Sequence, residues 1–443
     1  FLRFYEHLTR VERFGGMDTI FALATAQGKA GVAIIRISGP QAFIAAEILC
    51  HSVPPNQGPK LKTLVDENGL VLDRAFVLSF SGPKSFTGED TVEFHLHGST
   101  AVISIVLKTL GSGVARLAEP GEFTRRALDN NKLDLAQVEG LADLIEAETE
   151  VQRRQALRGM VGDLGKHIEE WRKKLIRSAA LIEATIDFSD EDVPVDVSVE
   201  VIHLLGEVEA GLTLQLKGFS VAERIRTGFE VAIIGSPNTG KSTLLNALAC
   251  REAAITSEYA GTTRDIIEVR MDLNGVPVTL LDTAGLRQAM DEIEIIGINR
   301  AISRAKQADL RIFLKEPDEI LPLLALSDDI ILAPKADLRN DDLPSVSGIT
   351  GEGLSNLTAE ISERLKSRIA LAGLVTHERH NTAIKESLIK LVAAKQHISL
   401  GPDHYDITAE EIRSAVRCLE VIIGRVDVEN LLDEIFSSFC LGK

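Results

Sequence analysis

Cysteine, positive charge and long apolar runs are all in short supply in this sequence. No run approaches the ~18 consecutive apolar residues of a membrane-spanning helix, which argues against that class of protein. The cysteines have neither metal-site spacing nor the pattern of a disulfide framework, so a reducing, cytoplasmic location is expected. There are four of them: Cys50, Cys250, Cys418 and Cys440.

The charge balance limits how the chain can bind nucleic acid. Its 48 Lys and Arg residues are outnumbered by 65 Asp and Glu residues, for a net charge of −17. Repulsion from phosphates argues against non-specific binding, so an RNA substrate would need a local basic patch or a partner protein. A hydrophobic content of 45% with 26% charged residues indicates globular packing, and 443 residues predict two to four domains.

Residues 235–242 match the phosphate-loop pattern of two glycines four residues apart, followed by Lys and a hydroxyl residue. The apolar run 229–234 predicts a buried strand before the loop, and 242–249 predicts the helix that the loop opens. In this context backbone N–H groups bind phosphate oxygens, Lys reaches the outer phosphates, and the hydroxyl is a Mg²⁺ ligand. The expected nucleotide contacts are Asn238, Thr239, Gly240, Lys241, Ser242 and Thr243.

Two further segments indicate a GTPase. An apolar strand at 278–281 ends in Asp282, Thr283, Ala284 and Gly285, which places a carboxylate near Mg²⁺ and a flexible glycine near the terminal phosphate. A polar loop upstream is typical of a segment that closes over the metal ion only with a triphosphate, with Thr263 as a Mg²⁺ ligand. Its predicted nucleotide contacts are Ser257, Glu258, Tyr259, Ala260, Gly261, Thr262 and Thr263.

Residues 333–337 follow a predicted strand at 330–332 and indicate guanine recognition. Asp337 can accept the paired N–H donors of guanine, and the Lys335 side chain can cover the ring. The usual motif has Asn where this chain has Pro334, so weaker guanine binding is expected. Ser347, Gly348 and Ile349 are predicted to add backbone to the base pocket.

The residue that positions the attacking water is not at its usual place. Many GTPases have Gln just after the Asp-Thr-Ala-Gly run, but here that place holds the apolar Leu286. The downstream acids Asp291, Glu292 and Glu294 are candidates, and for each a solvated loop acid is the alternative.

The rest of the chain alternates between two patterns. Short apolar runs at 32–37, 75–80 and 92–96 predict an α+β domain, whereas 133–188, 199–226, 381–400 and 409–439 have helical periodicity, with a break near 159–165. The predicted helices before and after the nucleotide segment each have an apolar stripe with no partner inside their own segment. These helices are therefore expected to pack together. The domains predicted are 17–132 (α+β), 133–227 with 373–443 (helical) and an inserted 228–372 (α/β GTPase, mixed sheet with helices on both faces). Residues 1–16 are interpreted as a non-native leader before Met17.

The N-terminal domain contains polar residues that are candidates for a ligand-binding site. Arg36, Glu93 and Lys132 suit an acidic ligand, with ordinary surface charge as the alternative. His95 and His97 alternate to one strand face, where polar surface or core is favoured over a metal site because no third ligand is evident.

Several motifs, taken in order, are similar to those of the tRNA-modification GTPase family MnmE, also called TrmE. The similarity covers nearly the whole chain from Met17. Besides the nucleotide-binding runs, the motifs are residues 36–39, 85–90, 120–124, 132–137 and 439–443.

The resemblance implies a Ras-like P-loop GTPase activated by K⁺-dependent dimerisation, with Asn238, Ser257, Tyr259 and Thr262 at the K⁺ site and Glu294 as catalytic glutamate. It implies a homodimer whose N-terminal domain binds 5-formyltetrahydrofolate or a related tetrahydrofolate, with contacts from Arg36, Glu93, Lys132 and Lys443. Cys440 would belong to the modification site. The implied substrate is tRNA wobble uridine, and the implied partner is the FAD- and NADH-dependent MnmG (GidA), in a heterotetramer.

Two other functions are alternative hypotheses. A regulatory GTPase could bind and release a partner without taking part in chemistry, or a folate-binding scaffold could carry a degenerate nucleotide site. The intact Lys241, Ser242, Asp282 and Gly285 argue against the scaffold.

Overall fold

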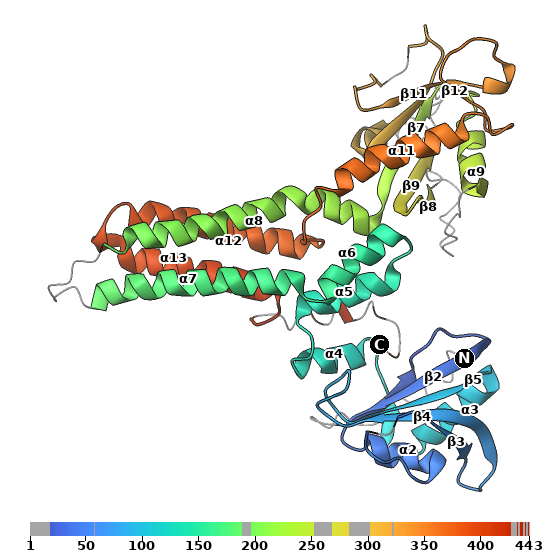
Figure 1. Ribbon diagram of the computed structural model, residues 1–443, viewed down its shortest axis with the longest axis vertical. Coiled ribbons are helices and arrows are strands. Elements are labelled where there is room, and N and C mark those ends of the chain that lie inside the picture. The colour runs from blue at the N-terminus through green and yellow to red at the C-terminus, as the bar shows by residue number, and fades with distance from the viewer. Residues whose placement is uncertain are drawn as a thin grey trace, which may run out of the picture. The chain divides into compact units, whose positions relative to one another are not determined.

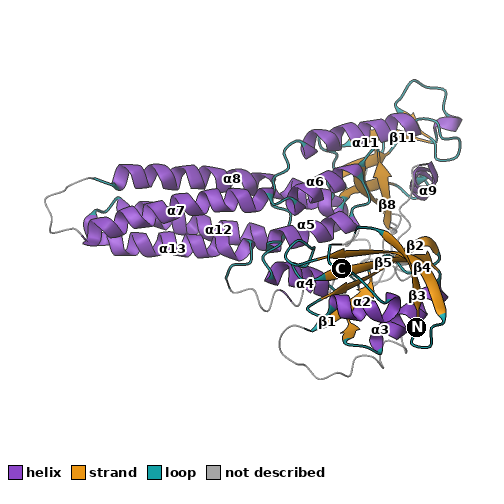
Figure 2. Cartoon of the chain, turned by 60° about the horizontal axis from the view of Figure 1, so that its bottom comes forward, coloured by secondary structure: helices purple, strands orange, loops and turns teal. Residues whose placement is uncertain are grey.

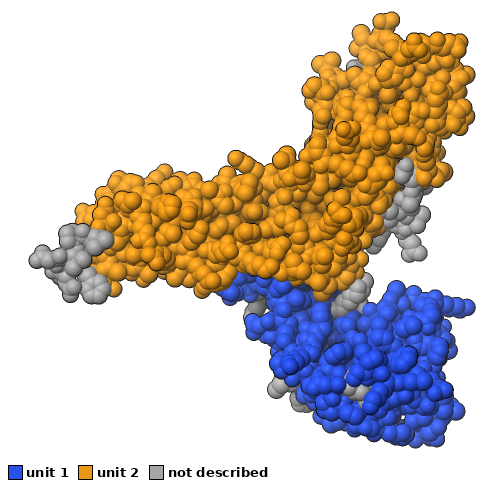
Figure 3. Space-filling model, viewed as in Figure 1, with its two compact units in different colours: residues 1–139, 423–443 blue, residues 140–422 orange. Residues whose placement is uncertain are grey.

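The computed structural model describes residues 18–56, 58–187, 196–251, 268–282, 302–320 and 323–426, with residues 432, 435, 436, 439 and 442. The chain forms two compact units, which Figures 1 and 3 show: residues 1–139 with 423–443, and residues 140–422. Within the described ranges, no helix is both long enough and apolar enough to cross a lipid bilayer.

The first unit is built on a six-stranded sheet with the order β3-β4-β5-β2-β1-β6. β1 pairs parallel with β6, and the other neighbours are antiparallel. Strands predicted at 32–37, 75–80 and 92–96 are confirmed as parts of β2, β4 and β5. The strands are β1 (Thr19–Leu23), β2 (Ala30–Ser38), β3 (Lys60–Val65), β4 (Val71–Phe80), β5 (Thr91–Gly98) and β6 (Ala115–Leu117).

Helices cover both faces of the sheet at β1. α2 (Ala42–Cys50) and α3 (Thr100–Gly111) pack on one face (Figure 2), where Phe21 joins the main core. Ile20 points to the opposite face and packs with Phe123 of α4 (Glu122–Asp129). Successive residues of a strand face opposite sides, so β1 is buried throughout.

Four long helices of the second unit pack side by side in Figure 1: α7, α8, α12 and α13. They bring together helices from before and after the nucleotide segment, as their apolar stripes predict. The predicted break near 159–165 is also confirmed, because α6 ends at Met160 and Gly162 has φ 81°. The helices are α5 (Leu135–Glu146), which crosses the boundary between the units, α6 (Glu150–Met160), α7 (Asp163–Asp187), α8 (Ser198–Thr227), α12 (Glu378–Ile398) and α13 (Tyr405–Ile422).

The helical periodicity predicted at 409–439 is interrupted by a turn. α13 ends at Ile422, and the chain turns at residues 423–426. Gly424 has φ 76°, a left-handed conformation that glycine adopts without strain and that interrupts an α-helix. Apolar periodicity continues across this turn because the following residues also contribute buried side chains, such as Phe436 and Phe439.

A second six-stranded sheet has the order β12-β11-β10-β7-β9-β8, parallel except for the antiparallel β8–β9 pair. Val231 and Ile233 of β7 face a core shared with α9 and α11, whereas Ala232 and Ile234 face Ala305 on the other side. The predicted mixed sheet with helices on both faces is confirmed. The elements are β7 (Phe229–Gly235), α9 (Lys241–Arg251), β8 (Glu268–Leu273), β9 (Val276–Asp282), β10 (Leu310–Leu314), β11 (Ile330–Pro334), β12 (Ser345–Val346) and α11 (Leu354–Ile369).

The chain returns from this sheet to the helices by crossing α8 at Gly218. The Gly373 N–H donates to the Gly218 carbonyl at 3.3 Å, and the Leu374 N–H donates to the Gln215 side chain at 2.8 Å. A Cβ at Gly218 would lie 2.4 Å from the Gly373 nitrogen. The crossing therefore requires a residue without a side chain.

We expect Gly218→Ala to lower the free energy of unfolding by about 1–3 kcal/mol, because backbone atoms must move apart to admit the methyl group. Gly206→Ala is the matched control on the same helix, where a Cβ would meet nothing within 4 Å. Higher helix propensity should make that variant more stable by roughly 0.5–1 kcal/mol. Denaturant unfolding followed by circular dichroism measures both. Equal stability of Gly218→Ala and the parent would contradict the close backbone contact between Gly218 and Gly373.

Candidate functional site

Segments that are far apart in sequence meet at one edge of the second sheet. Parallel strands place their carboxyl ends together, and ligands of such sheets bind outside those ends. The phosphate loop follows β7, and Asp282 ends β9 opposite Ile233 of β7. Lys335 follows β11, and Ser347 follows β12.

The phosphate loop is held in shape by its own lysine. Lys241 is 5% exposed, and its ammonium donates to the carbonyls of Gly235 at 2.8 Å and Ser236 at 2.7 Å. Asn238 and Gly240 have positive φ values of 64° and 91°, which turn the backbone around this ammonium. Burial lowers the pKa of Lys241, against the opposing influence of Asp282 and Glu319. An anion beside Lys241 would favour its charged form.

Ser242 and Asp282 form the second part of the site. The Ser242 hydroxyl donates to Asp282 Oδ2 at 2.6 Å. Asp282 is 3% exposed, and its Oδ1 has no hydrogen-bond partner within the described ranges. A buried carboxylate oxygen without a partner, next to a hydroxyl, is the hard oxygen donor set that Mg²⁺ prefers. These residues therefore fit the predicted magnesium ion.

The end of β12 packs onto the helix that the phosphate loop opens. Ser347 is 2% exposed, and its hydroxyl accepts the N–H groups of Ile349 and Thr350, both at 3.2 Å. A Cβ at Gly348 would lie 2.7 Å from the carbonyl carbon of Thr243. The predicted base-pocket residues thus lie beside the predicted phosphate-binding residues.

Pro334 occupies the last position of β11. The β10–β11 ladder has its last pair at Leu314–Leu332, so the missing N–H of Pro334 costs no ladder bond toward β10. Lys335 then adopts a left-handed conformation, with φ 58°, and Asp337 lies in the 3₁₀ turn Ala336–Leu338. Both side chains are exposed, as a base-binding pair requires.

Other residues predicted for the nucleotide site lie outside the described part of the chain, so their roles stay predictions. Between α9 and β8 they are Ser257, Glu258, Tyr259, Ala260, Gly261, Thr262 and Thr263. After β9 they are Thr283, Ala284, Gly285, Leu286, Asp291, Glu292 and Glu294.

A second group of candidate residues lies in the first unit. Arg36 of β2 is paired with Glu93 of β5, with Arg36 Nε 2.9 Å from Glu93 Oε1. The Arg36 guanidinium lies 5.3 Å from the ring centre of Phe86 and 5.8 Å from that of Phe123. Within cation–π range, these rings restrict how the guanidinium can turn.

The two histidines of β5 have separate carboxylate partners. His95 lies 3.4 Å from Glu93, and His97 lies 2.7 Å from Asp73. No group of three or more His, Cys, Asp or Glu side chains with metal-binding geometry occurs in the described ranges.

Lys132 and the chain terminus complete the predicted group. Lys132 is exposed, and its Cε would lie 3.2 Å from a Cβ placed at Gly88. A Cβ at Gly442 would lie 2.0 Å from the Leu23 carbonyl oxygen, so the tail backbone passes against the end of β1. Cys440 and Lys443 lie outside the described residues.

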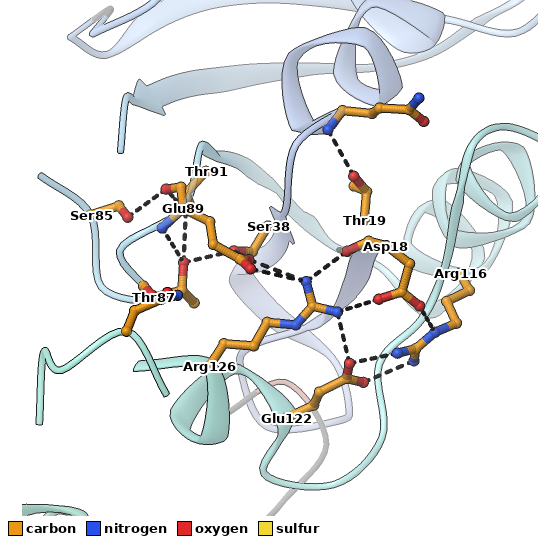
Figure 4. Close-up of polar contacts among 12 residues, drawn as sticks. Asp18, Thr19, Ser38, Ser85, Thr87, Glu89, Thr91, Arg116, Glu122 and Arg126 are labelled. Atoms are coloured by element: carbon orange, nitrogen blue, oxygen red, sulfur yellow. Dashed lines mark hydrogen bonds and ion pairs between the residues drawn. The ribbon is translucent and has the colours of Figure 1, made fainter. Parts of the chain in front are cut away.

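Sequence reasoning missed the charged network in Figure 4, which supports this region. Arg126 of α4 contacts Asp18, Glu89 and Glu122, and Arg116 also contacts Asp18 and Glu122. Residues 85–90 and 120–124 stood out as motifs, but their spacing did not reveal a shared contact. Only the packing of α4 beside the β4–β5 loop brings them together.

Comparison with known proteins covers both units. Residues 19–132 match the family model "GTP-binding protein TrmE N-terminus", and residues 135–440 match "MnmE helical domain". The tRNA modification GTPase MnmE of Roseobacter denitrificans is 60% identical over 96% of this chain and 100% of its own length. The proteins of the same description from Ruegeria sp. (strain TM1040) and Ruegeria pomeroyi are each 58% identical, with the same coverage.

We expect Pro334→Asn to tighten guanine nucleotide binding, because the amide adds hydrogen-bonding groups that proline lacks. One added hydrogen bond of about 1 kcal/mol corresponds to an affinity gain of roughly five-fold. Pro334→Ala is the matched control, since it removes the ring without adding an amide. Titration with a fluorescent GDP analogue measures both, and an asparagine variant no tighter than the alanine variant would contradict the role of this position.

Proposed function

The chain belongs to the MnmE family of tRNA modification GTPases, and on that premise we propose that it is the GTP-hydrolysing subunit of an enzyme that modifies C5 of the wobble uridine, U34, in tRNA. The product would carry an aminomethyl or carboxymethylaminomethyl group. The observation that carries the proposal is the meeting of Lys241, Ser242 and Asp282 at one sheet edge, in a chain that matches the family along nearly its whole length.

The nucleotide chemistry follows from these groups. Lys241 and the loop backbone would bind the outer phosphates of GTP, and Ser242, Thr263 and Asp282 would hold Mg²⁺. Bound Mg²⁺ would supply positive charge to the phosphates. Asp337 and Lys335 select guanine. Glu294 takes over the positioning of water, because the Leu286 side chain has no polar atom with which to do so.

A monovalent cation completes the proposed hydrolytic site. Asn238, Ser257, Tyr259 and Thr262 are the proposed K⁺ ligands. Asn238 has a left-handed φ of 64° and is exposed. Bound K⁺ supplies the positive field that an arginine finger provides in other GTPases. The site is completed when the GTPase domains of two copies meet.

The first unit is proposed to bind 5-formyltetrahydrofolate or a related tetrahydrofolate as the one-carbon source. Arg36 and Lys132 suit its acidic groups, and Glu93 suits the donor edge of the pterin. Lys443 would add a further cation, and Cys440 would act at the modification site. The tail's close approach at Leu23 supports a role for the C-terminus in this unit.

The proposed assembly is a cytoplasmic homodimer that joins MnmG, an FAD- and NADH-dependent partner, in a heterotetramer acting on tRNA. A net charge of −17 supports a division of labour in which the partner holds much of the RNA. Within each copy, residues 17–132 form the folate-binding and dimerisation domain, 133–227 with 373–443 the helical domain, and 228–372 the GTPase domain.

GTP turnover should be at least about ten-fold faster in KCl than in NaCl at equal ionic strength, because K⁺ replaces a transition-state cation. Asn238→Ala should lose this stimulation. Asn246→Ala is the control, since Asn246 is an exposed amide on α9. Equal turnover of the parent in both salts would contradict the cation mechanism and favour a regulatory GTPase switch.

Mass analysis of tRNA nucleosides tests the substrate. In cells that lack the parent gene product, Lys241→Ala should fail to restore the modified U34 nucleoside, because phosphate binding is lost. Cys440→Ser should hydrolyse GTP at nearly the parent rate yet leave less modified U34. Full restoration of modified U34 by Lys241→Ala would contradict the coupling of GTP hydrolysis to the modification.

A further inference from the structure

The loop of residues 81–90, between β4 and β5, lies against two cations of the proposed folate site, Arg36 and Lys132. The Phe86 ring lies 5.3 Å from the Arg36 guanidinium. Two residues later, Gly88 lies so close to Lys132 that a Cβ would be 3.2 Å from its Cε. The position of this one loop therefore sets the surroundings of two side chains that are about 100 residues apart in sequence.

Arg36 is restrained on several sides but keeps donors for a ligand. Glu93 accepts the Nε–H, and the buried Phe123 ring lies on the side of α4. Within the described part of the chain, the Nη atoms of Arg36 make no hydrogen bond. A guanidinium held by Nε and by two rings presents its Nη donors in a fixed direction, which suits a carboxylate of the ligand.

The loop is fastened at Thr87 and Glu89. The hydroxyls of Thr87 and Ser38 lie 2.7 Å apart, and the Asn130 amide donates to the Thr87 carbonyl at 2.7 Å. The Glu89 carboxylate accepts from the Ser38 hydroxyl at 2.8 Å and from Arg126 at 3.2 Å (Figure 4). The loop is thus bound to the end of β2 and to α4.

Arg126 is the centre of this fastening. Its side chain is 11% exposed and donates to the Asp18 carbonyl at 2.7 Å, to the Asp18 carboxylate at 2.7 Å and to Glu122 at 2.9 Å. Burial alone raises the pKa of Glu122, but hydrogen bonds from Arg116, from the Glu119 backbone N–H and from Arg126 outweigh it and lower that pKa. The carboxylate is therefore charged at neutral pH and requires a cation beside it.

We propose that Arg126 is a positioning residue of the folate site: by holding Glu89 it fixes the 81–90 loop, and the loop orients Arg36 through Phe86 and confines Lys132 through Gly88. The inference rests on the folate site proposed above. If Arg126 is removed, Arg116 is the remaining cation of the network beside three carboxylates, those of Asp18, Glu89 and Glu122. The mutual repulsion of these carboxylates then loosens the loop. A lysine cannot replace the planar fork that reaches all three partners.

The test uses the full chain with Arg126→Met and Arg126→Lys, and with Arg125→Met, the exposed neighbour on α4, as matched control. Glu89→Gln carries the test if Arg126→Met loses its circular dichroism spectrum. Two quantities are measured: amide hydrogen exchange of peptides covering residues 81–90, and the dissociation constant for 5-formyltetrahydrofolate by calorimetry. Phe86→Leu separates the two roles, because it removes the ring but not the fastening.

Arg126→Met should speed exchange in the 81–90 peptides and weaken folate binding, each at least ten-fold, with Arg126→Lys close to it and Glu89→Gln showing smaller changes in the same direction. Phe86→Leu should weaken binding with exchange near the parent's, and Arg125→Met should change neither. If the parent binds folate and Arg126→Met binds it equally well, the positioning role is overturned while the folate site stands. If the parent binds no folate, the cofactor assignment fails and this role falls with it.

Discussion

Parallel pairing of β7 with β9 is the constraint on which the nucleotide site depends. The register that sets Ile233 opposite Asp282 places a buried carboxylate beside the strand that opens the phosphate loop. Ser242, the second residue of α9, then donates to Asp282 at 2.6 Å. Because β11 and β12 run in the same direction, Asp337 and Ser347 arrive at the same edge. A phosphate, a metal ion and a base can therefore be bound at one edge of this sheet.

The same sheet is joined to the helices through contacts at its far end. The Val151 N–H at the start of α6 donates to the Gly275 carbonyl in the β8–β9 turn at 3.1 Å. At the end of α8, Arg224 lies 3.1 Å from Asp309, and Arg226 donates to the Thr376 carbonyl at 3.2 Å. The β8–β9 hairpin thus has Asp282 at one end and the start of α6 at the other.

Charge is handled in opposite ways in the two candidate sites. In the nucleotide site, burial lowers the pKa of Lys241, and Asp282 Oδ1 has no hydrogen-bond partner among the described residues. In the first unit, Arg126 and Glu122 are fully engaged with each other and with neighbouring charges. Charged groups that are paired with one another stabilise the fold, whereas charged groups without such a pairing can bind a ligand. The net charge of −17 reveals neither arrangement.

The sequence by itself determined the local features: the phosphate loop, the strands at 229–234 and 278–281, the long helices and the α/β character of the inserted segment. Each depends on residues close together in the chain, such as the spacing of Gly235, Gly240 and Lys241, and on the periodicity of apolar side chains. Only the tertiary structure decided that Pro334 fits because the β10–β11 ladder has already ended, and that Gly424 ends α13 at Ile422. It alone joined Glu89 to Arg126, because a contact between a loop and a helix depends on how the elements pack, and no spacing along the chain records that.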